Sequence, residues 1–365
     1  MTVRDIFQTY GVAYLNKYTD TIPDNHRKVI HDIMDCRTER MGTILCSCNS
    51  CGYSFEIYKS CGNRHCPTCQ GEKANDWLSK RLDQMLPVHH FMITFTVPAP
   101  FREFFRSHQS FAYSNLFNSS SFVLKKLASE KTYFDGDIPG FFGVLHTWGR
   151  QIQYHPHIHY IVPGGAFSSL DHSWHSSNKS FYLPVRIMSK LVKSFFYKKM
   201  KKESFLHLIP DNTWEQDWNV NSQAVGNGAR SVQYLANYVF RTAISDQRVL
   251  TVENDKVLFK YLDTRTEKEK TTRLHVFEFI RRFLQHVLPK GFMKIRYFGF
   301  IHPSSKIPLK TAVILLEAFY GFKAVNNEFY KRKSKTHRCP YCKKEHTIRY
   351  IHFTSSIKVS ISGFT

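Results

Sequence analysis

The sequence predicts an α+β fold with a mainly antiparallel sheet. Segments of β-branched and aromatic residues that stop at Pro or Gly are mixed with segments of helical periodicity, and no regular strand–helix–strand repeat joins them. The length of 365 residues favours two or three domains, and an apolar content of 42% is enough for a sizeable core. Seven of the nine cysteines lie between residues 36 and 69, which marks a small metal-binding module before a large middle domain.

Each predicted element rests on the period of its apolar residues and on the residues at its ends. Helices are predicted at residues 1–45, 72–87, 101–130, 186–206, 229–245 and 276–289. Strands are predicted at residues 89–100, 140–148, 155–165, 256–263 and 293–301. The first of these strands is expected to end at Pro98 and Pro100, because proline lacks the backbone N–H that a strand interior needs.

The charge of the chain predicts a polyanionic partner. Lys and Arg number 51 against 29 Asp and Glu, which gives a net charge of +22. With 31 Phe and 19 Tyr available to stack on unpaired bases, nucleic acid is the expected partner, and Lys198 and Lys199 of the basic helix are candidate residues that bind it. A membrane span and a signal peptide are not expected, so the predicted location is the cytoplasm.

The cysteines predict structural zinc. Cys48 and Cys51 form one Cys-x-x-Cys pair and Cys66 and Cys69 form another, and together they offer the four thiolates of a closed tetrahedral site. Further candidate ligands are Cys36, Cys61 and His65 and, for a second zinc site, Cys339 and Cys342. The spacing leaves open how these residues divide between one zinc ion and two.

Three histidines predict a second kind of metal site. Alternate residues of a strand point to the same face, so His157 and His159 lie on one face, roughly 7 Å apart along the strand. His146 lies on the preceding predicted strand, and a hairpin-like connection would return it beside the pair. An incidental pair of strand histidines is the alternative interpretation.

The helix predicted at residues 229–245 carries two tyrosines four positions apart. Tyr234 and Tyr238 therefore share a face, and Arg241 lies on it too. Its aliphatic residues form a separate stripe on the opposite face: Val232, Leu235, Ala236, Val239 and Ala243. An amphipathic helix with two surface tyrosines is the alternative to a helix that carries nucleophiles.

Six motifs in order resemble those of the two-tyrosine HUH transposases (histidine, hydrophobic, histidine) of rolling-circle bacterial insertion sequences. The motifs are CRTERMG, SCGNRHCPTCQ, FTVPAP, LHTWGRQIQYHPHIHY, YLANYVFRTAIS and FIRRFLQHVLPKGFMKIRYFGF, and the resemblance runs from about residue 3 to about residue 303. It implies a zinc-binding domain at residues 1–86 and an HUH nuclease domain with a central antiparallel sheet at 87–303. A basic C-terminal region with a Cys-x-x-Cys pair would follow at 304–365.

The resemblance also implies roles for residues. His157 and His159 would bind a catalytic Mg²⁺ or Mn²⁺, and Tyr234 and Tyr238 would be the paired nucleophiles. His146 is the expected third ligand, with Gln247 as its rival. The chain departs from the family pattern where Thr-His often follows the second tyrosine, since Val239 and Phe240 stand there, and where Asn often follows Ile-Ser, since Asp246 stands there.

The function implied is a bacterial, nucleoid-associated transposase that cuts and joins single-stranded DNA. A plasmid replication initiator or relaxase would share this chemistry, but the paired tyrosines and the N-terminal cysteines favour transposition. A non-catalytic zinc-dependent nucleic-acid-binding protein is an alternative of another class. A zinc hydrolase fits least well, because the segment HPHIH has no evident general-base carboxylate beside it.

Overall fold

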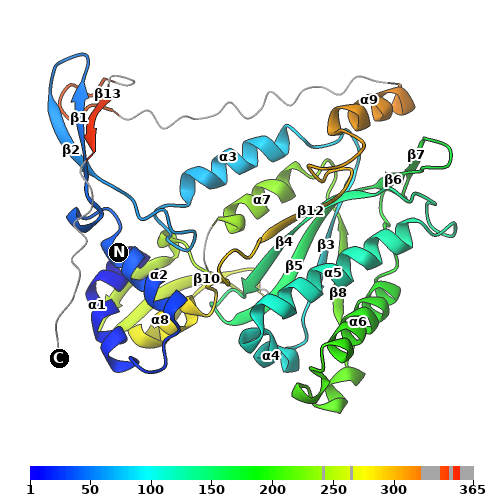
Figure 1. Cartoon of the computed structure of the whole chain (residues 1–365), viewed down its shortest axis with the longest axis horizontal. Helices are drawn as coiled ribbons and strands as arrows, with labels where there is room; N and C mark the ends of the chain where they lie inside the picture. The colour runs from blue at the N-terminus through cyan, green and yellow to red at the C-terminus, as the bar shows by residue number, and fades with distance from the viewer. Residues whose placement is uncertain (241–242, 264–265, 322–337, 345–347, 354–365) are drawn as a thin grey trace. The chain divides into compact units, whose positions relative to one another are not determined.

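The computed structural model describes residues 1–240, 243–263, 266–321, 338–344 and 348–353 (Figure 1). The chain forms two compact units. The first, here called the cysteine unit, comprises Met1–Lys73, Phe240–Val287 and Lys331–Thr365, and the second, the sheet unit, comprises Ala74–Val239 and Leu288–Tyr330. The functional boundaries at residues 86 and 303 stay a prediction.

The sheet unit is built on a five-stranded antiparallel sheet, which confirms the predicted fold class. The strand order is β12-β4-β5-β3-β8, and every neighbouring pair is antiparallel. The strands are β3 His90–Thr96, β4 Gly140–Trp148, β5 Tyr154–Pro163, β8 Asn219–Ala224 and β12 Ile295–Gly299. β4 and β5 lie near the centre of the sheet, and nearly all of their residues are buried.

Helices cover both faces of this sheet. Figure 1 shows one group on one side, namely α4 Arg102–Ser107, α5 Gln109–Ala128 and α6 Val185–Lys202. Two helices lie on the other side, α3 Gly71–Leu82 and α7 Ala229–Val239. The smaller elements of the unit are η2 Ala99–Phe101, β6 Gly165–Phe167, β7 Trp174–Ser176, η3 Leu206–Leu208, η4 Asp211–Glu215 and α9 Leu309–Tyr320.

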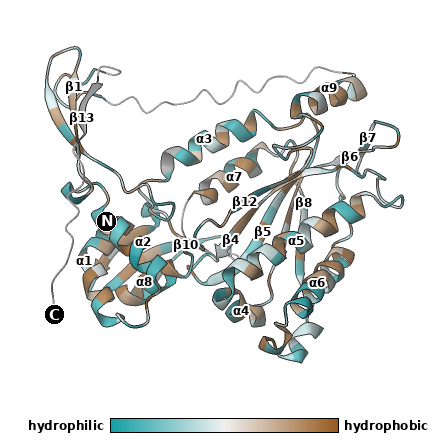
Figure 2. Ribbon diagram, viewed as in Figure 1, coloured by the Kyte–Doolittle hydropathy of each residue, from teal (hydrophilic) through white to brown (hydrophobic). Residues whose placement is uncertain are grey.

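Strand alternation gives the sheet two faces, and one of them packs into the main hydrophobic core. Ile158, Tyr160 and Val162 of β5 point into the main hydrophobic core, which α4, α5 and α6 complete. The helices mix hydrophobic and hydrophilic residues along their length, as expected for elements that bury one face (Figure 2). The odd-numbered residues of β5 therefore face α3 and α7. Trp77 of α3 packs edge-on against Phe142 of β4 on that side, with ring centroids 5.8 Å apart.

In its described residues, the cysteine unit contains two smaller sheets and the α-helices α1, α2 and α8. Its elements are α1 Val3–Lys17, α2 Asp24–Asp35, η1 Glu39–Met41, β1 Thr43–Cys48, β2 Ser54–Tyr58, η5 Asp246–Arg248, β9 Val249–Glu253, β10 Lys256–Leu262, β11 Glu269–His275, α8 Val276–Leu284 and β13 Ile348–Phe353. The sheets have the orders β13-β1-β2 and β11-β10-β9. α1 packs against α2 and α8, and the rings of Phe7 and Phe283 meet edge-on at 5.2 Å.

Several predicted elements need correction. The helix expected at 1–45 is two helices followed by strand β1, and the helix expected at 101–130 is interrupted at His108. Strands β8, β9 and β11 were not predicted, because residues such as Asn219 and Asn221 of β8 lack the apolar alternation of a half-buried strand.

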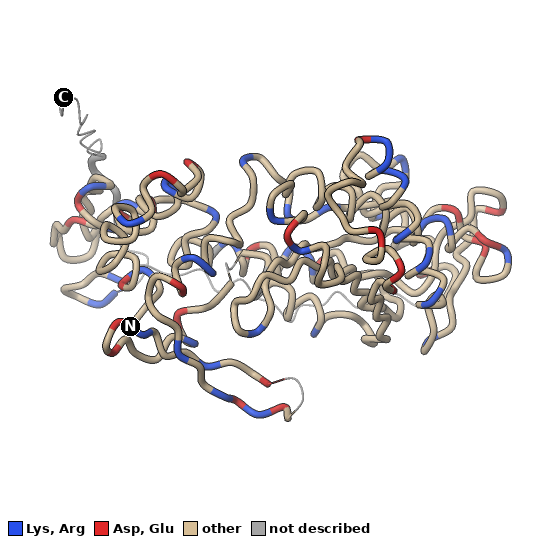
Figure 3. The backbone as a smooth tube through the Cα atoms, turned by 90° about the horizontal axis from the view of Figure 1, so that it is seen from below, with Lys and Arg blue, Asp and Glu red and all other residues tan. Residues whose placement is uncertain are grey.

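Lys and Arg are spread over both units rather than confined to one segment (Figure 3). Within the described ranges, no helix has the length and apolarity needed to cross a bilayer.

The end of β12 gives a test of the packing. A Cβ atom at Gly299 would lie 1.5 Å from the carbonyl oxygen of Pro139, whereas Gly291 has open space around it, and both glycines have a positive φ. We expect Gly299→Ala to lower the free energy of unfolding by about 3 kcal/mol or more, because the clash is with backbone. Gly291→Ala should cost about 1 kcal/mol, the conformational penalty alone. Denaturant unfolding of both variants measures this, and equal losses would contradict the packing described.

Candidate functional site

The three predicted histidines lie together on one face of the central sheet. His157 of β5 is the antiparallel partner of His146 on β4, and His159 lies two residues further along β5. Each imidazole offers one nitrogen, and the three nitrogens lie within 4.8 Å of one another. The ring centroids are 4.7 to 5.3 Å apart. The strand pairing thus gathers three neutral nitrogen donors that can hold one divalent cation.

Hydrogen bonds fix the orientation of two of these rings. Nδ1 of His157 lies 2.7 Å from the carbonyl oxygen of His155, so it must donate, and Nε2 is the nitrogen left to accept. Nδ1 of His159 lies 2.8 Å from Oγ1 of Thr94, its cross-strand neighbour on β3. A metal-binding histidine usually makes a hydrogen bond through the ring nitrogen that does not bind the metal. Such a bond at Nδ1 orients the ring so that Nε2 points toward the metal ion.

Burial keeps the histidines neutral. His146 and His159 are only 3% and 9% exposed. Desolvation lowers the pKa of His146 and of His157 well below the ordinary value, and the neighbouring imidazoles lower both further. Desolvation lowers the pKa of His159 to about 4. All three imidazoles are therefore unprotonated at neutral pH, the form that binds a metal ion.

Helix α7 brings Tyr234 to the histidines. The helix packs on β4 through its aliphatic stripe, in which Val232 and Leu235 are fully buried. Tyr234 lies off this stripe, 44% exposed, and its ring meets that of His159 edge-on with centroids 6.3 Å apart. Tyr238 lies one turn later on the same helix, and its side chain is outside the described residues, as is Arg241.

Other side chains around the histidines could not be identified from the sequence. Trp148 stacks on His146 with an interplanar angle of 16°, and Nζ of Lys294 lies 4.6 Å from the centre of the Trp148 ring. Nη2 of Arg102 donates to Nδ1 of His155 at 2.8 Å. These cations come from segments far from the histidine motif, so only the fold reveals that they border it.

Two predicted DNA-binding residues lie elsewhere. Lys198 and Lys199 are on α6, which covers the sheet face opposite to the histidines. Lys199 forms an ion pair with Glu203 at 2.7 Å, and Lys198 lies over the ring of Phe195. Their contact with DNA stays a prediction. Gln247, the rival third ligand, is an exposed residue of η5 in the cysteine unit.

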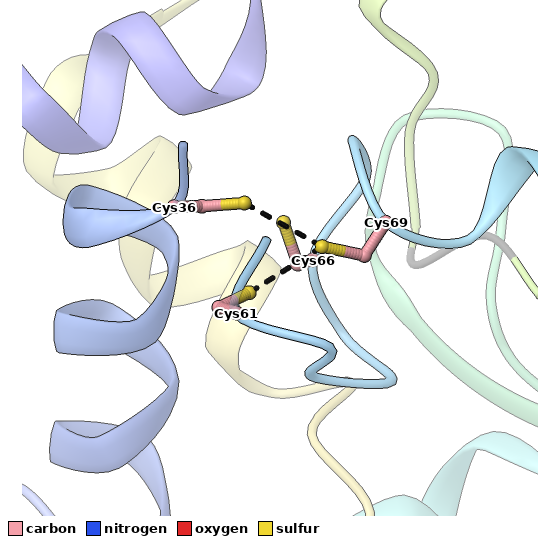
Figure 4. A group of neighbouring side chains, drawn as sticks. All are labelled: Cys36, Cys61, Cys66 and Cys69. Carbon is pink, nitrogen blue, oxygen red and sulfur yellow. Dashed lines mark hydrogen bonds between the residues drawn. The ribbon is translucent and has the colours of Figure 1, made fainter. Parts of the chain in front are cut away.

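The structure divides the cysteines differently from the predicted group of Cys48, Cys51, Cys66 and Cys69. Cys66 and Cys69 do not group with Cys48 and Cys51 but with Cys36 and Cys61, and the four sulfurs lie within 4.8 Å of one another. Figure 4 shows the four side chains pointing toward one centre. Sγ of Cys69 is 3.5 Å from Sγ of both Cys36 and Cys61. Four thiols in this arrangement fit tetrahedral zinc.

Sequence spacing could not reveal this division, because the fold decides which Cys-x-x-Cys pair lies near which other cysteine. Cys36 follows the last residue of α2, and this helix brings it to the loop that carries Cys61 and Cys66. His65 belongs to neither cysteine group. The second group combines Cys48 and Cys51 with the C-terminal pair.

Comparison with known proteins gives two family matches. Residues 140–307 match a family described as "Putative transposase", and residues 6–97 match a transposase zinc-binding domain. The chain is 34% identical over 319 residues to "Putative transposase y4qJ" of Sinorhizobium fredii, covering 82% of this chain and 80% of that protein. It is 28% identical over 294 residues to the "Transposase for insertion sequence element IS801" of Pseudomonas savastanoi pv. phaseolicola, covering 75% and 70%. No solved structure matches the chain.

The histidine site predicts metal-dependent stability with a defined pH range. At about one hundred times its dissociation constant, Mn²⁺ should raise the free energy of unfolding by about 2.7 kcal/mol at pH 7.5. The folded state disfavours protonated His159, whose pKa is about 4, so the unfolded chain binds more protons between about pH 4 and 6.5. The contribution of unprotonated His159 to the free energy of unfolding should be fully present above pH 6.5 and should decline as the pH falls toward 4. The stabilisation by Mn²⁺ should follow the same pH dependence.

Thermal unfolding with and without Mn²⁺ measures this effect. His157→Ala should abolish the stabilisation by Mn²⁺, because it removes one nitrogen of the group of three. His155→Ala is the matched control, since His155 lies two residues away and outside that group. Equal responses of the two variants would contradict a cation held by the three histidines.

Proposed function

This chain belongs to the family of insertion-sequence transposases that includes the IS801 transposase, and we propose that it nicks and joins single-stranded DNA through a 5′-phosphotyrosine intermediate. The reaction would mobilise an insertion sequence by rolling-circle-like transposition. The observation that carries the proposal is the approach of Tyr234 to the three histidines, with a ring separation of 6.3 Å from His159.

The chemistry follows from these groups. The phenolic oxygen of Tyr234 attacks the scissile phosphorus in line, the Oη–P bond forms, and the bond from phosphorus to the 3′ oxygen breaks. The phenolic proton is lost and the departing 3′ oxygen takes one up. The new bond keeps the phosphodiester energy, so a 3′-hydroxyl can later attack the phosphotyrosine and rejoin a strand without ATP.

The histidines supply the electrostatic part of the proposal. His146, His157 and His159 would hold Mg²⁺ or Mn²⁺, which, when bound, stabilises the negative charge that develops on the phosphate. Imidazole ligands suit Mn²⁺ better than Mg²⁺, which prefers oxygen. Trp148 and Thr94 keep the rings of His146 and His159 in place, so little reorganisation is needed during the reaction.

The second tyrosine gives the proposal its link to transposition. Tyr238 is one helical turn from Tyr234, and two nucleophiles on one helix allow a second strand to be cut before the first is released. A replication initiator or relaxase would use the same cleavage step. The relatives named as transposases and the N-terminal cysteines support transposition instead.

Transposases act on DNA, and single-stranded DNA is the substrate proposed here. Aromatic rings stack on unpaired bases and cations neutralise phosphates. Lys294 lies over the ring of Trp148, which stacks on His146, and Arg102 donates to His155, two residues before His157. Lys198, Lys199 and Arg241 are proposed as further DNA contacts.

The paired tyrosines give the test. Wild-type protein incubated with Mn²⁺ and single-stranded DNA carrying the ends of its element should form a covalent adduct that survives a denaturing gel. Tyr234→Phe with Tyr238→Phe should abolish the adduct, because no phenolic oxygen remains to attack. His157→Ala should reduce it by about a hundredfold, the usual effect of removing one electrostatic contact to the transition state.

The matched control is Tyr58→Phe, which alters a tyrosine that is 50% exposed on β2 and should leave the adduct unchanged. An adduct that persists in the double tyrosine variant would show that the nucleophile lies elsewhere. Retained DNA binding without any adduct, in wild-type protein, would favour the non-catalytic DNA-binding alternative.

A further inference from the structure

We propose that Cys48, Cys51, Cys339 and Cys342 form a second zinc site that joins the C-terminal segment to the N-terminal hairpin. The matched zinc-binding domain ends at residue 97, so half of this site lies outside it. All four cysteines belong to the cysteine unit. The site would be a closed structural one, independent of the histidines and of the proposed reaction.

The sulfur positions fit a tetrahedral ion. Sγ of Cys48 lies 3.7 Å from Sγ of Cys342, and Sγ of Cys51 lies 3.8 Å from Sγ of Cys339, although each pair is nearly 300 positions apart. Thiolates at about 2.3 Å from one tetrahedral zinc ion lie about 3.8 Å from each other. A disulfide would need a separation of about 2.05 Å, so the spacing is that of metal ligands rather than of cystine.

The two Cys-x-x-Cys turns repeat the same backbone pattern. In the first, the N–H of Gly52 donates to the carbonyl of Cys48 at 2.8 Å, and in the second the N–H of Lys343 donates to that of Cys339 at 3.0 Å. The residue after each second cysteine has a left-handed φ, +71° at Gly52 and +60° at Lys343. In each turn the first cysteine N–H donates to the carbonyl five residues later, at Tyr53 and Lys344.

This repeat points to a pair of metal-binding knuckles. A left-handed residue after the second cysteine lets the chain turn sharply, so that both thiols of a pair face the same point. Glycine adopts this conformation readily, but a lysine seldom does unless the surroundings require it. Lys343 adopts the same left-handed conformation as Gly52, so the second turn directs both of its thiols toward one point in the same way as the first turn.

Contacts around the cysteines bring the two segments together. β13 pairs with β1 along residues 44 to 48, next to the first knuckle. The ring of Tyr341 stacks on that of Tyr53 at 5.4 Å with an interplanar angle of 17°, yet Tyr341 stays 72% exposed. Cys339 is fully buried within the thiol group. Zinc binding would release the thiol protons to solvent and satisfy this buried sulfur.

The zinc content of full-length protein and its variants tests the site. Cys339→Ser with Cys342→Ser should lower the zinc content by one ion per chain, as should Cys48→Ser with Cys51→Ser. The quadruple variant should also lose only one ion, because both pairs bind the same one. Cys46→Ala, a change to a buried cysteine outside both groups, is the control and should lose none. A zinc ion bound at the histidines would add equally to the zinc content of every variant. The test therefore compares the difference in zinc content between each variant and wild-type protein.

Wild-type protein provides a second measurement that does not depend on the folding of variants. Alkylation during a titration with a zinc chelator should label Cys48, Cys51, Cys339 and Cys342 together, in step with the release of one zinc ion. Labelling of the C-terminal pair without zinc release would overturn the proposal. So would two ions lost from the quadruple variant, or none lost from the Cys339 and Cys342 double variant.

Discussion

The antiparallel register of β3, β4 and β5 is the constraint on which the candidate site depends. It sets His157 opposite His146 and places Thr94 opposite His159. A slip of one residue would turn every side chain of a strand to the other face and send the histidines into the apolar core. That core holds the register, because Ile158 and Tyr160 fill it from the intervening positions. The same alternation that builds the hydrophobic layer therefore assembles the donors.

A site of this kind carries a stability cost that its surroundings offset. Buried neutral imidazoles give up hydrogen bonds to water, and Thr94 and the carbonyl of His155 replace one for each of two rings. Helix α7, in contrast, has to keep a side chain exposed. Val232 and Leu235 bury the other face of the helix, so Tyr234 need not be buried and is accessible to a DNA strand. The cysteine unit has an apolar core of its own, in which Phe7 of α1 packs against Phe283 of α8.

The sequence allowed the fold class and the histidine group to be predicted, and it failed where long-range contacts decide. The alternation of side chains along a strand was enough to predict that His157 and His159 share a face. The helical period of α7 was enough to predict that its tyrosines lie on a different face from its aliphatic residues. The division of the cysteines could not be predicted, because it depends on α2 bringing Cys36 to Cys69 and on a segment nearly 300 positions away. The hydrogen bond between Thr94 and His159 could not be predicted either, because it depends on the register between β3 and β5.

The most direct test of the central claim is to identify the amino acid that carries the DNA. The covalent adduct of wild-type protein would be digested with nuclease and protease, and the modified peptide sequenced by tandem mass spectrometry. We predict a nucleotide linked through its 5′ phosphate to Tyr234 or Tyr238, both within one peptide of helix α7. A phosphate on another residue, or a 3′ linkage, would contradict the assignment of this helix as the source of the nucleophile.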